Sequence, residues 1–120
     1  MTWNVEFTDR ARRDLRDILD YITYKFHEPQ TAVKLVRQIT KEILSLDNMP
    51  MRYRLYDNEP LKSQGLRCFP VKNYIVFYYP DESKNTVYAV RIIYGGRDIR
   101  HKLMETEPNN FKTKSPPEEC

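Results

Sequence analysis

The second half of the chain carries side chains that together suit an anionic ligand. They are five cations, one imidazole and one phenol: Arg67, Arg91, Tyr94, Arg97, Arg100, His101 and Lys102. An arginine can hold a phosphate or a carboxylate through two parallel hydrogen bonds and stays charged at any relevant pH. A histidine can donate or accept a proton near neutral pH, and a tyrosine can stack on a base. These seven residues therefore form the candidate binding site.

Metal-free cleavage of RNA is one reaction that such residues could support. A base takes the proton of the ribose 2′-OH, cations stabilise the charged phosphorane, and an acid protonates the leaving oxygen. The plainer interpretation is ordinary surface, in which Arg91 faces solvent on its strand and Arg97 pairs with Asp98 or a helix carboxylate. For any single residue the plainer interpretation is the more common outcome, whereas the cluster as a whole favours binding.

The positive charge of the chain is concentrated beside these residues. Residues 1–51 contain 8 Lys or Arg and 8 Asp or Glu, whereas residues 52–103 contain 10 against 5, a net charge of +5. Residues 104–120 contain 2 Lys and 4 Glu, a net charge of −2. The asymmetry suggests an anionic partner, either nucleic acid or an acidic protein segment. A solvated basic surface without a partner explains the counts equally well.

Other kinds of site are poorly supported by the sequence. His27 and His101 stand 74 positions apart with no Cys or His at ligand spacing, so we expect no metal. Only 3 glycines occur, which argues against a glycine-rich phosphate loop, and we expect no cofactor. Cys68 and Cys120 do not suggest a disulfide framework, and we interpret Cys68 as a small apolar residue in or near a sheet.

The length and hydropathy of the chain predict one small cytoplasmic domain. A chain of 120 residues is the size of a single domain. It has no run of 18 apolar residues, so no membrane helix is expected. The N-terminal residues lack the basic and apolar regions of a secretory signal, which favours the cytoplasm.

The first half of the chain predicts a strand and two helices. Trp3–Phe7 alternates apolar and polar residues, and Thr8 then offers an N-cap for a helix from Asp9 to about Phe26. Pro29 suits the first turn of a second helix, whose apolar stripe runs from Ala32 to Leu46. The link between the two helices is short, so they should form an antiparallel hairpin.

The polar side of the first helix carries paired charges. The pairs Arg10–Asp14, Arg13–Asp17 and Arg16–Asp20 are each four residues apart. This spacing predicts a solvent-exposed face with salt bridges, and we do not interpret it as a nucleic-acid surface.

The second half predicts a long loop and three strands. The loop is Met51–Ser63, and the strands are Gln64–Val71, Asn73–Tyr79 and Thr86–Tyr94. Short polar links predict an antiparallel meander, in which Pro70 makes its strand an edge or bulged one.

The predicted fold class is α+β, with residues 1–103 as one domain. The N-terminal strand and the antiparallel helical hairpin precede the three-stranded antiparallel meander, and the hairpin should cover one face of the sheet. The other face should be partly exposed and display Tyr and Arg side chains. Residues 104–120 contain three Pro and four Glu, so we expect a flexible, disordered tail.

Several segments, taken in this order, resemble the RelE/ParE superfamily of toxins from type II toxin–antitoxin systems. The opening helix segment is Phe7–Ile22. The others are Gly65-Leu66-Arg67, Val71–Tyr79 and Val90–Ile99. The resemblance implies a cytoplasmic growth inhibitor of the same α+β fold, encoded beside an antitoxin protein that neutralises it.

The resemblance implies two alternative targets. ParE-type toxins block a type II topoisomerase, DNA gyrase, without known catalysis, whereas RelE-type toxins cut mRNA on the ribosome. The Asn73–Tyr78 segment and the Tyr94–Ile99 ending are more similar to the ParE-like branch. For a nuclease the resemblance implies Arg67, Arg97 and His101 as catalytic residues.

The nuclease pattern is incomplete in this chain. A tyrosine expected near Leu103 is absent, and His101 is the residue that would replace it. An enzyme is therefore expected only if the target is mRNA. In either case an acidic antitoxin segment should wrap the domain and pair with Arg67, Arg91 or Arg97.

Overall fold

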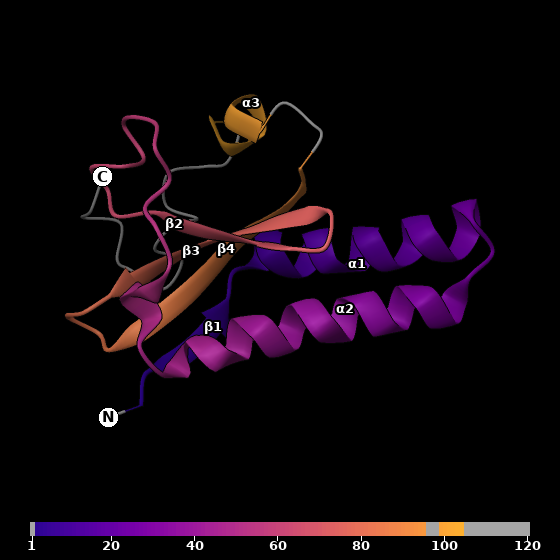
Figure 1. Cartoon of the computed structure of the whole chain (residues 1–120), viewed down its shortest axis with the longest axis horizontal. Helices are drawn as coiled ribbons and strands as arrows, with labels where there is room; N and C mark the ends of the chain where they lie inside the picture. The colour runs from indigo at the N-terminus through magenta and orange to yellow at the C-terminus, as the bar shows by residue number, and fades with distance from the viewer. Residues whose placement is uncertain (1, 96–98, 105–120) are drawn as a thin grey trace.

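The computed structural model describes residues 2–95 and 99–104 and has the predicted α+β architecture (Figure 1). Its elements in chain order are β1 (Asn4–Phe7), α1 (Asp9–Lys25), α2 (Pro29–Leu44), the 3-10 turns η1 (Ser45–Asp47) and η2 (Pro50–Arg52), β2 (Arg67–Val71), β3 (Tyr74–Asp81), β4 (Thr86–Tyr94) and α3 (Ile99–Met104). The tail predicted for residues 104–120 lies outside the described residues, except that Met104 ends α3.

Local sequence signals account for the boundaries of the helical hairpin. The Thr8 hydroxyl accepts a hydrogen bond from the backbone N–H of Ala11 at 3.0 Å, which caps α1 as predicted. His27 turns the chain with a φ of 55°, and Pro29 occupies the first turn of α2, where a missing N–H costs nothing. The two helices lie side by side along one face of the sheet (Figure 1).

The sheet has the strand order β1-β4-β3-β2. Strands β2, β3 and β4 form the predicted antiparallel meander, and the exposed Pro70 lies on the edge strand β2. Strand β2 begins at Arg67 and not at Gln64, because Gly65 adopts a φ of 90° just before it. The N-terminal strand β1 pairs with β4 in parallel, from Asn4 opposite Thr86 to Phe7 opposite Ala89.

The larger core lies between the hairpin and the sheet. The fully buried Ile39, Ile43 and Leu46 pack with Val76 and Tyr78 of β3. Ile39 and Ile43 belong to the apolar stripe of α2, and Leu46 follows in η1. The predicted packing of the hairpin on one face of the sheet is therefore confirmed.

The opposite face of the sheet is covered, and our expectation of a partly exposed face is wrong. A second apolar cluster buries Cys68, Phe77 and Val90 beneath Leu61 and Leu103, which come from the loop after η2 and from α3. Figure 1 shows α3 on the side of the sheet away from α1 and α2. The cover was missed because a loop and a short helix have no long apolar period.

An extra residue in β4 changes which side chains face the helices. Tyr78 pairs with Ala89 and Phe77 pairs with Arg91, so Val90 has no partner in β3. Val87 and Ala89 belong to the core under the hairpin, and Ile92 continues it in place of Arg91. The bulge therefore removes Arg91 from a row of apolar side chains in which strict alternation would have placed it.

Candidate functional site

Arg91 is buried and forms a two-point ion pair with α1. Its Nε donates to Asp14 Oδ2 over 2.7 Å, and its Nη2 donates to Asp14 Oδ1 over 3.2 Å. Arg91 is 4% exposed and Asp14 is 6% exposed. Arg91 therefore does not face solvent, as the plainer interpretation had it. Asp14 does not lie on the solvent-exposed side of α1, as we expected. Asp14 points to the sheet because β4 offers it three donors, including the arginine.

Asp14 also closes an open edge of the sheet. The β1 ladder ends at Phe7 opposite Ala89, which leaves the following backbone donors of β4 without a strand neighbour on that side. The Ile92 N–H donates to Asp14 Oδ2 over 2.8 Å, so the carboxylate replaces the missing strand. Arg10 lies near the same carboxylate, with its Nε 3.6 Å from Asp14 Oδ1.

Arg91 connects this ion pair to α3, the helix that carries two other candidate residues. Its Nη1 donates to the backbone oxygen of Lys102 over 3.1 Å. On α3, Leu103 is fully buried, His101 is exposed and Lys102 is half-buried. Arg97 lies outside the described residues, as does the side chain of Arg100.

Arg67 holds the chain that leaves α2. Its Nη1 donates to the backbone oxygens of Met51, over 3.2 Å, and Tyr53, over 2.6 Å. Tyr78, its partner on β3, donates its hydroxyl to the Pro50 oxygen over 2.6 Å. Burial raises the pKa of Tyr78 to about 12, against the opposing effect of Arg67 and other neighbours. Both side chains thus fasten the segment after α2 to the sheet.

The structure does not bring Arg67 and Arg91 to one point. Arg67 shares its face of β2 with Phe69, which belongs to the core under the hairpin. Arg91 shares its face of β4 with Ile93, which belongs to the opposite cluster. Strand β3 also separates the two arginines, so they do not form a joint phosphate clamp.

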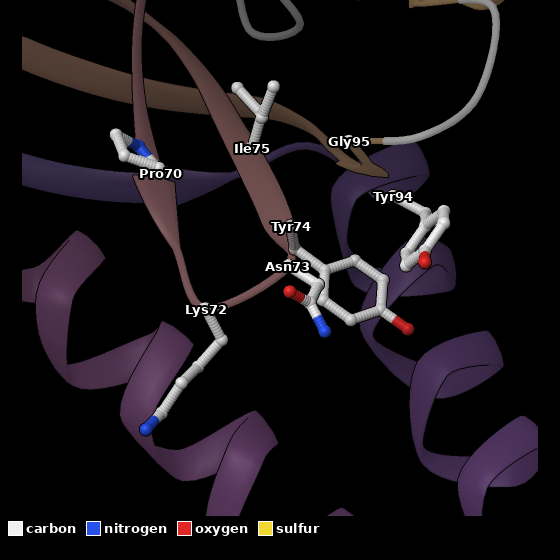
Figure 2. A pocket seen from close by; sticks show the side chains of 7 residues that line it. All are labelled: Pro70, Lys72, Asn73, Tyr74, Ile75, Tyr94 and Gly95. Atoms are coloured by element: carbon white, nitrogen blue, oxygen red, sulfur yellow. The ribbon is translucent and has the colours of Figure 1, made fainter.

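Tyr94 lies at a shallow hollow at the end of the sheet (Figure 2). The hollow has a volume of about 320 Å³ and is lined by Pro70, Lys72, Asn73, Tyr74, Ile75, Tyr94 and Gly95. The Tyr74 and Tyr94 rings meet edge to face with centroids 5.6 Å apart, and Tyr94 is 45% exposed. Burial, with smaller effects from Tyr21 and Tyr94, raises the pKa of Tyr74.

Lys72 and Asn73 were not among the predicted site residues. They form the two-residue turn between β2 and β3, and Lys72 has a φ of 55°. Figure 2 shows the Lys72 side chain pointing away from Pro70 and toward the helices. A polar pair between two β-rich segments is a turn signal, and it places these residues beside the end of β4 once the meander forms.

The pKa shifts found for buried groups do not create a reactive nucleophile. Burial raises the pKa of Cys68, with Arg54 opposing it, and burial also raises the pKa of Tyr88. These groups and the two tyrosines described above therefore stay protonated at neutral pH. Within residues 2–95 and 99–104, no three His, Cys, Asp or Glu side chains gather as a metal site.

The family follows from a match that covers most of the chain. Residues 5–99 match the family described as ParE toxin of type II toxin-antitoxin system, parDE. The chain belongs to the ParE toxin family. It is a type II toxin of the RelE/ParE superfamily, as the resemblance implied. No curated protein matches the sequence.

Three solved structures share the fold of this toxin. A chain of the RelBE2 toxin–antitoxin complex from Mycobacterium tuberculosis is 21% identical, with a TM-score of 0.57 over 78% of this chain and 92% of that chain. A chain of the chromosomal ParDE system from P. aeruginosa is 20% identical, with a TM-score of 0.62 over 78% and 96%. The E. coli RelE toxin, in a variant with two arginines replaced by alanine, is 12% identical, with a TM-score of 0.60 over 85% of this chain and 93% of that chain. Identities this low show the fold alone.

The candidate residues of the toxin thus fall into two groups. Arg67 and Arg91 are tied to backbone oxygens of the toxin itself, whereas Tyr94 and His101 present exposed side chains. No helix in the described ranges is both long enough and apolar enough to cross a membrane.

Proposed function

We propose that this toxin inhibits growth by binding a type II topoisomerase, DNA gyrase, without catalysis of its own, and that a cognate antitoxin neutralises it in the cytoplasm. The observation that carries the proposal is the match of residues 5–99 to the ParE family. In the superfamily, the ParE branch is the one that blocks gyrase. A binding function also needs no general base. The buried groups whose pKa is raised, such as Cys68 and Tyr78, stay protonated at neutral pH and cannot act as one.

The use of Arg67 and Arg91 supports the same choice. A ribonuclease of this fold needs several cations that face one phosphate in the transition state. Arg67 donates to the oxygens of Met51 and Tyr53, and Arg91 is paired with Asp14. These two arginines therefore contribute to the fold.

A ribosome-dependent, metal-free mRNA endonuclease is the second candidate. The observation that favours it is the exposed His101 on α3, next to Lys102 in a basic part of the chain. An exposed imidazole can serve as acid or base on an RNA substrate. Arg97 and Arg100, close in sequence, would supply the charge that stabilises the phosphorane.

Two assays separate the candidates. Purified toxin is added to gyrase with relaxed plasmid, and in parallel to translating ribosomes with a defined message. The proposal expects inhibited supercoiling and intact mRNA. Message cleavage together with normal supercoiling would instead establish the nuclease.

The His101→Ala variant tests the same choice at one residue. A nuclease that uses His101 as acid or base should lose roughly 10²- to 10⁴-fold in rate, whereas a gyrase binder should lose far less. His27→Asn is the matched control, because His27 is the other exposed histidine and Asn tolerates its φ of 55°. The control should behave as wild type in both assays.

We further propose that the antitoxin covers the exposed apolar end of the helical hairpin. Tyr21, Tyr24, Phe26 and Val33 are exposed there, around the bend between α1 and α2. An amphipathic segment that folds on binding would bury them, and its carboxylates would meet the cations of the second half. Because the sheet face is covered, the hairpin and not the open sheet is the surface proposed here.

Co-expression tests the antitoxin proposal. The toxin and the product of the adjacent reading frame should purify as one complex, and Tyr24→Asp should weaken it. Asp17→Asn, a charge change on the exposed side of the same helix, is the control. A failure of the wild-type pair to associate would show that the adjacent product is not the antitoxin.

A further inference from the structure

Helix α3 depends on the rest of the toxin for its position. It has six residues, and a helix this short is not stable by itself in water. One attachment is apolar, because Leu103 is fully buried and Ile99 packs against the cluster that contains Val90 and Ile93. A polar attachment comes from a guanidinium of the sheet.

That guanidinium belongs to Arg91, whose Nη1 donates to the backbone oxygen of Lys102 over 3.1 Å. Carbonyls in the last turn of a helix have no partner within the helix, and the negative end of the helix dipole favours a cation there. The bond is therefore a charge-assisted cap on the C-terminal turn of α3.

Asp14 fixes the direction of the Arg91 side chain. Both carboxylate oxygens accept from the guanidinium, and Oδ2 also accepts the backbone N–H of Ile92. The pair spans 77 positions in sequence and joins α1 to β4. Because two of the guanidinium nitrogens are held by Asp14, the third is held at the oxygen of Lys102.

We infer that Asp14 is a positioning residue, which acts through Arg91 to keep α3, with His101 and Lys102, docked against the sheet. The inference rests on the proposed function only where it assigns α3 to the surface that meets the target. The docking of α3 is a property of the fold and can be measured without any target.

A buried thiol introduced on α3 reports its docking. Leu103→Cys is made in a Cys68→Ala/Cys120→Ser background, and the rate of reaction with a chromogenic aromatic disulfide is measured under native conditions. The introduced thiol reacts only when α3 leaves the sheet, because residue 103 is fully buried. Met104→Cys in the same background gives the unprotected rate, since Met104 is exposed.

Two changes then remove the polar attachment. Asp14→Asn takes away the charge that directs Arg91. The double variant Asp14→Leu/Arg91→Met removes the ion pair altogether while filling its volume with apolar atoms, which buried pairs commonly tolerate. The double variant keeps the test decisive if Asp14→Asn does not fold.

Loss of one charge-assisted hydrogen bond should raise the reactivity of the thiol about 10- to 100-fold. Asp17→Asn, on the exposed side of α1, should leave it unchanged. Ile43→Val, a mild truncation in the core under the hairpin, should also leave it unchanged, because that change lowers global stability without touching α3. Equal protection of the introduced thiol in the reporter background and in the folded variants made in it would overturn the inference.

Growth inhibition by the same variants separates this inference from the proposed function. Higher thiol reactivity with weaker inhibition supports both. Higher reactivity with full inhibition would support the docking role of Asp14 and overturn the placement of α3 at the target surface.

Discussion

The two faces of the sheet are covered by very different structures. Under the hairpin, two helices of 17 and 16 residues supply a continuous apolar layer. On the other face, a loop and a six-residue helix supply single residues such as Leu61 and Leu103. Apolar contacts of the hairpin with the sheet recur along both helices, so the position of the helices does not depend on one contact. The second layer depends on a few separate attachments.

The comparison teaches that burial does not measure how firmly a residue is held. Ile39 and Leu103 are both fully buried. Ile39 is in the middle of a long helix, whereas Leu103 is one residue from the end of a short one. Segments with few attachments open locally at a small fraction of the global unfolding free energy. The face with α3 should therefore be the more dynamic one.

Truncation of the two buried side chains should give the largest difference. Ile39→Ala should lower the free energy of unfolding by about 2–5 kcal/mol, because it leaves a cavity in a layer that cannot close around it. Leu103→Ala should lower it by less and should speed amide exchange mainly within α3, because the helix can leave the sheet. Chemical denaturation and hydrogen exchange measure the two effects. Equal losses of global stability would contradict the difference between the faces.

The stability of the toxin at alkaline pH should depend on Tyr78, whose hydroxyl ties the segment after α2 to the sheet through the Pro50 oxygen. Burial raises the pKa of Tyr78 from 10.0 in the unfolded chain to about 12 in the folded protein. The folded state thus holds this proton more tightly, so its contribution is complete below pH 10 and is lost as the pH rises toward 12. Tyr78→Phe should flatten stability over this range relative to wild type. The comparison uses denaturation at several pH values, and an unchanged slope would contradict it.

Arg97→Ala should have the smallest effect on stability and a large one on activity. We propose that Arg97 grips an anionic group of the target, although it lies outside the described residues. Its loss should abolish growth inhibition and change the free energy of unfolding by under about 1 kcal/mol. Arg97→Lys should restore little activity, because an ammonium cannot make the two-point contact.

Arg12→Ala is the control for this prediction, since Arg12 is an exposed arginine whose contact is an ion pair with Asp9 on the same helix. It should remain fully inhibitory. If Arg97→Ala is as toxic as this control at equal expression, the basic segment is ordinary solvated surface.

Part of the candidate site was predictable and part was not. The basic segment before Met104 was visible in the charge counts, and the predicted strand Thr86–Tyr94 placed Tyr94 at its end. The roles of Arg67 and Arg91 were not visible. Each is an arginine in a β-rich segment, and nothing nearby in the sequence distinguishes one that binds backbone oxygens from one that faces solvent.

The sequence by itself determined the N-terminal strand, the two long helices, the meander and the helix-covered face of the sheet. The cap at Thr8, the stripe along α2 and the β-branched run of β4 act over a few residues, so local spacing is enough to recognise them. Membership of the superfamily was likewise present in short segments. These features depend on interactions within one element or between neighbours in the chain.

Only the tertiary structure decided where Asp14 points and how the other face is closed. Periodicity placed Asp14 on the solvent side of α1, with Arg10 as its partner. The structure turns it toward donors 77 and 78 positions away, because β1 ends early and leaves the Ile92 N–H without a strand neighbour. A bulge at Val90 then brings Arg91 to the same carboxylate. Strand ends and bulges are set by the pairing of distant segments, and no local pattern of residues encodes them.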